Sequence, residues 1–122
     1  MKKNKESQYK NKYSLEERKK DFEKIIQNYS NKIPVIIEKS SNSKISETIK
    51  TKYIFPNDLK MSELIYIIRE KLKINKYDAL YFIVDEKYAV TGSELLSELY
   101  HKYKDKEDNF LYLNYSEQQI FG

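Results

Sequence analysis

The last residue, Gly122, is the group in this 122-residue sequence with the most direct chemical use. It ends a segment, residues 116–122, that has no apolar periodicity, and the only other glycine is Gly92. Because a terminal glycine has no Cβ, it can enter a narrow channel and expose its carboxyl carbon to a nucleophile. Seven extended residues at about 3.3 Å each would carry that carboxyl group about 23 Å from a folded body. The pattern is typical of a carboxylate that is delivered into another protein's active site, although on this residue alone a chance terminus is the alternative.

Side chains that could carry catalysis are nearly absent from the sequence. It contains no cysteine, which excludes disulfides, thiolate nucleophiles and zinc sites of the cysteine type. The single histidine, His101, stands beside Lys102 near a predicted helix end, a position that suits a helix C-terminus better than a catalytic base. Asp105, Glu107 and Asp108 could hold a cation weakly, but a solvated turn is the simpler interpretation. We therefore expect no catalytic residue, no metal site and no cofactor, and we expect that the protein is not an enzyme.

Positive charge is concentrated in the first quarter of the chain. The net charge is +4, yet residues 1–32 contain ten Lys and Arg against five Asp and Glu, while residues 33–122 contain thirteen against fourteen. Such a stretch could meet an anionic membrane surface, an acidic protein or phosphates, or it could be solvated helix surface. The twelve tyrosines are dispersed and no glycine-aromatic RNA-binding motif occurs, so we expect no nucleic-acid partner.

Length and hydropathy are those of a single domain. A composition of 39% hydrophobic and 34% charged residues is typical of a folded, highly charged globule. The longest apolar runs, at residues 34–37 and 64–68, are far shorter than the roughly 20 residues that cross a bilayer. No apolar segment follows the charged N-terminus, so we expect no secretory signal and a cytoplasmic, reducing location.

A helix and a β-hairpin are predicted in the first half of the chain. Ser14 and Glu17 have the spacing of a capping box, and apolar residues follow a helical period from there to about Asn28. A shorter helical turn could precede it around residues 8–12, although these residues are too polar to fix it from the sequence. Strands are expected at 33–38 and 52–55, joined by a long polar loop, with Pro56 ending the second strand.

The second half continues with an alternation of helices and strands. Apolar residues at 61, 64, 65, 68 and 72 predict a helix over 61–73 that covers the sheet. A third strand is expected at 79–84, a short helix at 93–103 and a last strand at 110–115. This order indicates an α+β fold, the ubiquitin-like β-grasp with an N-terminal helical extension. We divide the one domain into the extension, 1–30, the β-grasp core, 31–115, and a flexible C-terminal tail, 116–122.

Five sequence blocks carry a family resemblance. They are KIPVIIEK at 32–39, KYIFPNDL at 52–59, IR at 68–69, DALYFIV at 78–84 and FLYLNYS at 110–116. In this order and with nearly matching gaps, from about Tyr9 to Gly122, they resemble the GABARAP-type autophagy modifiers, ubiquitin-like proteins that are coupled to phosphatidylethanolamine. Two departures are Ser30, where these sequences usually have proline, and the loop at 104–109, which is about two residues longer.

The resemblance implies that Gly122 is the conjugation residue. Its carboxylate would be adenylated by an activating enzyme, pass to that enzyme's cysteine and then to a conjugating enzyme's cysteine, and finally reach the lipid amine. The protein would be a cytoplasmic substrate that marks autophagosome membranes when lipidated, and a deconjugating cysteine protease is a further implied partner. Many relatives carry residues after the glycine that such a protease removes. None follows Gly122, so we expect either a gene that encodes the finished terminus or a processed chain. The alternative is a ubiquitin-like interaction module that is never conjugated.

The strand predicted at 52–55 could have a free edge, and such an edge can accept an extended peptide. The resemblance implies ligands with an aromatic-x-x-aliphatic motif preceded by acidic residues, as found in autophagy receptors and adaptors. The implied aromatic pocket is lined by Asp21, Ile25, Pro34, Lys52, Ile54 and Phe110. The implied aliphatic pocket is lined by Tyr53, Phe55, Pro56, Leu59, Leu64 and Ile67. The acidic residues would meet Lys32, Lys50, Lys52 and Arg69. For several apolar members of these sets, ordinary core packing is the alternative.

Overall fold

The computed structural model describes residues 7–45, 49–75 and 77–118. Its helices are α1 (Gln8–Lys12), α2 (Leu15–Asn28), α3 (Met61–Leu72) and α4 (Leu96–Tyr103). Its strands are β1 (Lys32–Lys39), β2 (Lys52–Pro56), β3 (Tyr81–Val84), β4 (Tyr88–Ala89) and β5 (Leu111–Ser116). None of the helices in these residues is long and apolar enough to cross a membrane.

Side-chain caps fix where the N-terminal helices begin. The Ser14 hydroxyl accepts a hydrogen bond from the Glu17 N–H at 3.1 Å, and the Glu17 carboxylate accepts one from the Ser14 N–H at 2.8 Å. The predicted capping box is therefore confirmed, and it satisfies amides that the helix cannot pair internally. Ser7 caps α1 in a similar way, because its hydroxyl accepts from the Lys10 N–H at 3.2 Å. The short helix that the sequence left open at 8–12 is therefore present as α1.

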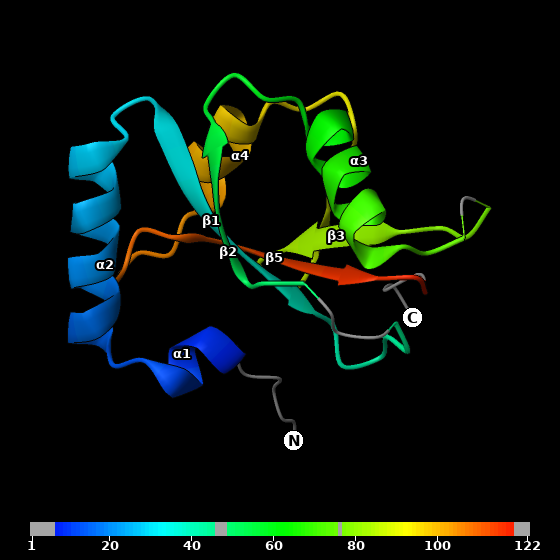
Figure 1. Ribbon diagram of the computed structural model, residues 1–122, viewed down its shortest axis with the longest axis horizontal. Coiled ribbons are helices and arrows are strands. Elements are labelled where there is room, and N and C mark those ends of the chain that lie inside the picture. Colours follow the sequence, from blue (N-terminus) through cyan, green and yellow to red (C-terminus); the bar gives the residue numbers. More distant parts are fainter. Residues whose placement is uncertain (1–6, 46–48, 76, 119–122) are drawn as a thin grey trace.

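Five strands of the described chain form one mixed sheet in the order β2-β1-β5-β3-β4. The predicted hairpin is confirmed, because β1 and β2 are antiparallel, with Lys32 opposite Pro56 and Ile36 opposite Lys52. The central pair, β1 and β5, is parallel, and β3 is antiparallel to both β5 and β4. Figure 1 shows α2 and α3 on opposite sides of this sheet. The arrangement is the β-grasp that the order of elements predicted.

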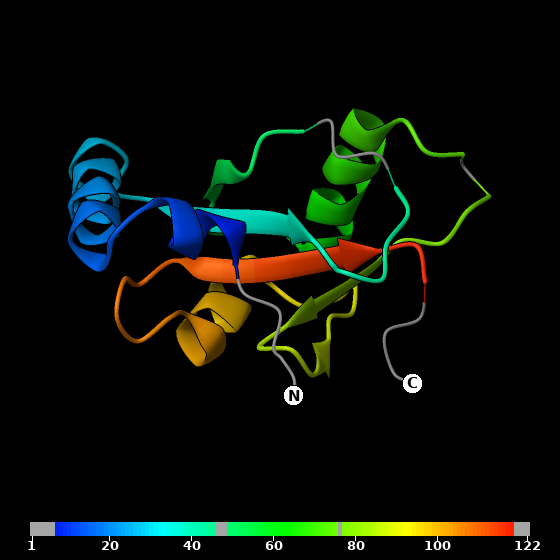
Figure 2. The same cartoon turned by 90° about the horizontal axis from the view of Figure 1, so that it is seen from below.

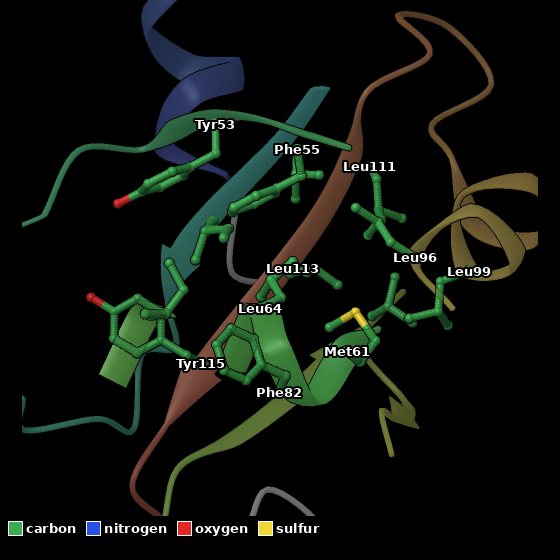
Figure 3. Packing of buried hydrophobic residues seen from close by; sticks show 14 of the residues in the cluster. Tyr53, Phe55, Met61, Leu64, Phe82, Leu96, Leu99, Leu111, Leu113 and Tyr115 are labelled. Atoms are coloured by element: carbon green, nitrogen blue, oxygen red, sulfur yellow. The ribbon is translucent and has the colours of Figure 1, made fainter. Parts of the chain in front are cut away.

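The main core lies between the sheet and the helices α3 and α4. The predicted apolar stripe of α3 is confirmed, since Met61, Leu64 and Ile68 are fully buried. Figure 3 shows Met61 and Leu64 of α3 and Leu96 and Leu99 of α4 gathered near Leu111 and Leu113 of β5. Helix α3 ends at Leu72, because the next residue, Lys73, has a left-handed φ of 57°.

A smaller cluster covers the other face of the sheet. It consists of Tyr9 from α1, Ile25 from α2, Ile36 from β1 and Phe110, with Phe22 packed against it. The ring centroids of Tyr9 and Phe110 are 5.5 Å apart in an edge-to-face arrangement. Figure 2 shows α1 lying over the sheet on this side. The Tyr9 N–H also donates to the Glu38 carboxylate of β1 at 2.8 Å, which ties α1 to the sheet.

The acidic stretch at 105–108 forms the expected turn, with Glu107 exposed, but it is also a structural junction because the Asp108 carboxylate is buried rather than solvated. Asp108 is 1% exposed, and it accepts hydrogen bonds from the Arg18 Nε at 2.8 Å and the Tyr112 hydroxyl at 2.5 Å. It also accepts from the Phe110 N–H at 3.0 Å. Asp105 nearby accepts from Lys10 of α1. This stretch therefore fastens both N-terminal helices to the segment that leads into β5.

Several boundaries differ from those predicted. Strand β3 begins at residue 81 rather than 79, and the short β4 was not predicted. Helix α4 begins at residue 96 rather than 93, because residues 91–94 form a turn. In that turn the Glu94 carboxylate accepts from the Thr91 N–H at 2.8 Å and the Tyr88 hydroxyl at 2.6 Å. Strand β5 runs one residue further than predicted and ends at Ser116, the first residue of the expected tail.

Candidate peptide-binding groove

Strand β2 has one unpaired edge. It pairs with β1 on one side, and no strand of the described residues pairs with its other side. Its side chains alternate, so that Tyr53 and Phe55 enter the main core while Lys52 and Ile54 remain partly exposed on the opposite face. The outer N–H and C=O groups of such an edge can pair with an added strand, and the flanking side chains can then read alternate positions of it.

The apolar residues expected in the aromatic pocket lie together on the α2 side of the sheet. Pro34 of β1 stands opposite Ile54 of β2 in the sheet register. Ile54 packs against the smaller cluster, to which Ile25 and Phe110 belong. Phe110 has no exposed surface and Ile25 is 6% exposed, so both lie beneath the surface and support it. The expectation of core packing therefore also holds for Ile25 and Pro34, which are buried.

Asp21 is the charged centre of this region. Its Oδ2 atom accepts a hydrogen bond from Lys52 Nζ at 2.5 Å and another from the Tyr9 hydroxyl at 2.9 Å. Burial, followed by the hydrogen bond to Asp21, raises the pKa of Tyr9, so the hydroxyl remains a donor at neutral pH. The side chains of Lys52 and Asp21 are 36% and 28% exposed, so water screens their ion pair. An acidic ligand group can therefore compete with Asp21 for Lys52.

The residues expected in the aliphatic pocket divide between the surface and the core. An open recess at the start of α3 is lined by Leu59, Ser62, Glu63, Tyr66 and Ile67. The two expected members of this lining, at positions 59 and 67, pack against the main core. The remaining expected members lie elsewhere: Tyr53, Phe55 and Leu64 are buried in that core, and Pro56 is exposed at the end of β2.

The expected cations take different places around β2. Lys50 Nζ lies 5.1 Å from the centre of the Tyr53 ring, and Lys32 Nζ lies 5.9 Å from the centre of the Tyr29 ring. Arg69 instead donates to backbone carbonyls of the loop after α3, at residue 78 (2.8 Å) and residue 75 (3.1 Å). Lys50 and Lys32 are exposed around β2, whereas the Arg69 guanidinium holds the loop that follows α3.

Sequence reasoning missed some residues of the aromatic side near α2 and of the recess on α3. Tyr9 and Phe22 support the aromatic side from the N-terminal helices, and Tyr66, which is 64% exposed, lines the recess. Tyr66 lies outside the apolar stripe of α3, so an aromatic residue on an otherwise polar helix face is the signal that could have found it.

In the part of the chain that the structure describes, no group of three or more acidic or histidine side chains is placed to hold a metal ion. Gly122 lies outside the described residues.

Comparisons with known proteins agree with this architecture. A family model described as autophagy protein Atg8, ubiquitin-like, matches residues 17–122. Autophagy-related protein 8 of Mycosarcoma maydis is 40% identical over 116 residues, which cover 95% of this chain and 97% of that protein. The protein of the same name from Neurospora crassa is also 40% identical over 116 residues, covering 95% and 94% of the two chains. The crystal structure of Trypanosoma brucei ATG8 superposes with a TM-score of 0.86 at 31% identity, over 92% of this chain and 95% of that one.

The mixed sheet with α3 and α4 on one face and an N-terminal helical addition on the other defines a ubiquitin-like protein of the β-grasp class. Together with the similarity over nearly the whole chain, it shows that the chain belongs to the Atg8 family of ubiquitin-like autophagy proteins.

Proposed function

We propose that this protein is a modifier conjugated through Gly122 to phosphatidylethanolamine. We also propose that the groove formed by the free edge of β2, the aromatic side near α2 and the recess on α3 recruits proteins with an aromatic-x-x-aliphatic motif to autophagic membranes. The observation that carries the groove is the free edge of β2, whose Ile54 packs against the smaller cluster and which is followed in the chain by Leu59 of the α3 recess. Membership of the Atg8 family supports the conjugation. The protein would act as a substrate and tag, moving from the cytoplasm to the autophagosome membrane.

The conjugation requires partners that supply every nucleophile. An activating enzyme would use ATP to adenylate the Gly122 carboxylate, with release of pyrophosphate, and its cysteine would then take the acyl group as a thioester, with release of AMP. The acyl group would pass to the cysteine of the conjugating enzyme and finally to the lipid amine, which forms the amide and frees that cysteine. A deconjugating cysteine protease would release the protein again. Reconstitution with both enzymes, ATP and phosphatidylethanolamine liposomes tests this sequence. We expect lipidated product from the wild type and little from Gly122→Ala, while wild-type amounts from the alanine variant would refute the mechanism.

Peptide recognition is tested separately by isothermal titration. Because affinity would come from two side-chain anchors and a short strand pairing, we expect a micromolar Kd for a peptide of the type acidic-Trp-x-x-Leu. Replacing both anchors with alanine should abolish the heat of binding. Equal binding of the two peptides would show that the pockets are assigned wrongly, and peptide binding without lipidation would favour the unconjugated interaction module.

The charge around the groove gives a third test. Lys52→Glu should weaken binding of the acidic peptide at low salt, and the loss should shrink as salt screens the site. The matched control reverses Lys2, Lys3 and Lys5, which belong to the basic first quarter of the sequence. If that control loses the peptide while Lys52→Glu keeps it, the N-terminal region is the recognition surface and the groove is misplaced.

A further inference from the structure

The last described residues of the chain are clamped by the loop that follows β1. One carboxylate oxygen of Glu117 accepts a hydrogen bond from the Ser43 hydroxyl at 2.7 Å, and the other accepts one from the Lys44 N–H at 2.8 Å. Ser43 is only 8% exposed, and its oxygen also accepts from the Ile45 N–H at 3.1 Å. Both oxygens of Glu117 are therefore held by one loop that lies more than 70 residues earlier in the sequence.

This loop is itself fixed to the sheet. The Ser40 N–H donates to the Tyr115 carbonyl of β5 at 2.8 Å, and the Ser43 N–H donates to the Ser40 carbonyl at 3.1 Å. On the tail side, Ser116 is fully buried, and its hydroxyl accepts from the Gln118 N–H at 3.0 Å. The clamp thus joins two segments that are each anchored to β5, and it holds the backbone at residue 117 in place.

Glu117 is suited to this role electrostatically. Its slight burial acts to raise the pKa of the carboxyl group, but the hydrogen bonds from Lys44 and Ser43 outweigh it and lower the pKa below the ordinary value of 4.5. The group is therefore ionised at neutral pH, and hydrogen bonds to a charged acceptor are stronger than those to a neutral one.

We propose that Glu117 is a positioning residue for the conjugation of Gly122, because its clamp sets the point at which the tail leaves the folded body. The inference rests on the proposed function. The clamp fixes residues 117 and 118 to the folded body, so its release adds two residues, about 7 Å of extended chain, between the body and Gly122. We take the clamped tail to be long enough to reach the active site of an enzyme bound to the body, and beyond that length the effective concentration of the carboxylate falls roughly as the −3/2 power of tail length. Lengthening the tail from four to six residues should therefore lower it about two-fold.

The test measures formation of the activating-enzyme thioester with purified activating enzyme and ATP, over a range of concentrations of this protein. The variants are Glu117→Ala, Ser43→Ala and their double mutant, and the control is Glu23→Ala, which removes an exposed carboxylate of α2. We expect Glu117→Ala to lower kcat about two-fold with KM unchanged, since the substitution changes only how residue 117 is anchored. The double mutant should match Glu117→Ala, and the control should match the wild type.

Hydrogen exchange of the Lys44 amide reports the clamp independently of any enzyme. It should be faster in Glu117→Ala than in the wild type. Faster exchange with an unchanged kcat would show that the clamp is only structural, and a raised KM with an unchanged kcat would show that Glu117 contacts the enzyme. Either result would overturn the positioning role while leaving the proposed function intact. A wild-type protein that forms no thioester would instead refute the proposed function, and this inference with it.

Discussion

The two faces of the sheet are covered by different means. On the face of α3 and α4, the core consists of aliphatic and aromatic side chains, among them Leu64, Leu96 and Leu113. On the face of α1 and α2 the buried apolar cluster is small, and a buried ion pair between Arg18 and Asp108 lies beside it. The side chains of this pair are 7% and 0% exposed.

The difference shows how an accessory segment can be joined to a complete fold. Apolar burial is non-directional and tolerates repacking, whereas a buried ion pair is stable only in one geometry with its remaining hydrogen bonds satisfied. Arg18 meets this condition, because its guanidinium also donates to the Tyr13 carbonyl at 2.7 Å. The polar junction thus fixes the position of the N-terminal helices on the sheet, and α2 carries residues of the candidate groove.

Asp108→Ala should produce the largest loss of stability. The substitution leaves the buried Arg18 guanidinium without its carboxylate and removes the acceptor of the Tyr112 hydroxyl and the Phe110 N–H. Breaking a buried pair by removing one partner typically costs about 3–5 kcal/mol. Urea unfolding followed by circular dichroism measures the loss.

Tyr112→Phe is the matched control for that substitution. It removes one hydrogen bond to Asp108 and leaves the ion pair in place, so a loss of about 1 kcal/mol is expected. A loss for Asp108→Ala as small as that for Tyr112→Phe would show that the junction contributes little, and that the apolar cluster alone holds α1 and α2.

A second prediction concerns Leu64 and Ile67, which were both expected in the aliphatic pocket. Leu64 has no exposed surface, so Leu64→Ala should cost about 2–5 kcal/mol of unfolding free energy by leaving a cavity. Ile67 lies at the recess and is only partly buried against the core, so Ile67→Ala should cost less, about 1–2 kcal/mol. In peptide titrations, Ile67→Ala should weaken binding at least about five-fold, the size of effect typical of a residue that anchors an interface.

Comparing Leu64→Ala with Ile67→Ala separates the contribution of core packing to stability from the contribution of the groove to peptide binding. If Ile67→Ala lowers stability as much as Leu64→Ala, or binds the peptide with wild-type affinity, the recess does not hold the aliphatic side chain of the ligand. Both measurements use the same purified proteins, and titrations at a temperature well below each unfolding midpoint keep the two effects apart.

The fold could be predicted from local patterns, and the polar junction could not. The capping box at Ser14 and the stripe of α3 are encoded within a few residues, so their helices were predicted to within a residue or two. The pairing of Arg18 with Asp108 spans 90 residues, and nothing in the local sequence distinguishes its carboxylate from that of a solvated turn. The same holds for the clamp of Glu117 by Ser43.

The candidate groove was predicted only in part, because burial depends on the packing of whole elements. The resemblance supplied both sets of pocket residues. It could not show that Leu64 is covered completely, that the Arg69 guanidinium holds the loop after α3, or that Tyr9 shares the carboxylate of Asp21 with Lys52. Each of these facts follows from contacts between elements that are far apart in the sequence.

The smallest expected effect concerns Lys10 and Asp105, the more exposed of the two ion pairs in the junction. Burial alone would raise the pKa of Asp105, but hydrogen bonds from Lys10 and from backbone N–H groups outweigh it and lower the pKa below the ordinary value of 3.8. A carboxyl group whose pKa is lowered by folding adds stability that is complete above its ordinary pKa and is lost as the pH falls through its lowered value. Because the Lys10 side chain is 37% exposed and screened by water, we expect Lys10→Met to cost only a fraction of a kcal/mol at pH 7.

Thermal unfolding of the wild type and Lys10→Met between pH 3 and pH 7 tests this account. The difference in Tm should be largest at neutral pH and low salt, shrink when salt is added, and decrease below about pH 3.8 as Asp105 becomes protonated. Any part of the difference that does not change with pH would come from the contact of Lys10 Nζ with the Tyr112 ring, whose centre is 4.7 Å away. A difference that grows as the pH falls would contradict the assignment, because the ion pair would then not be the group that titrates.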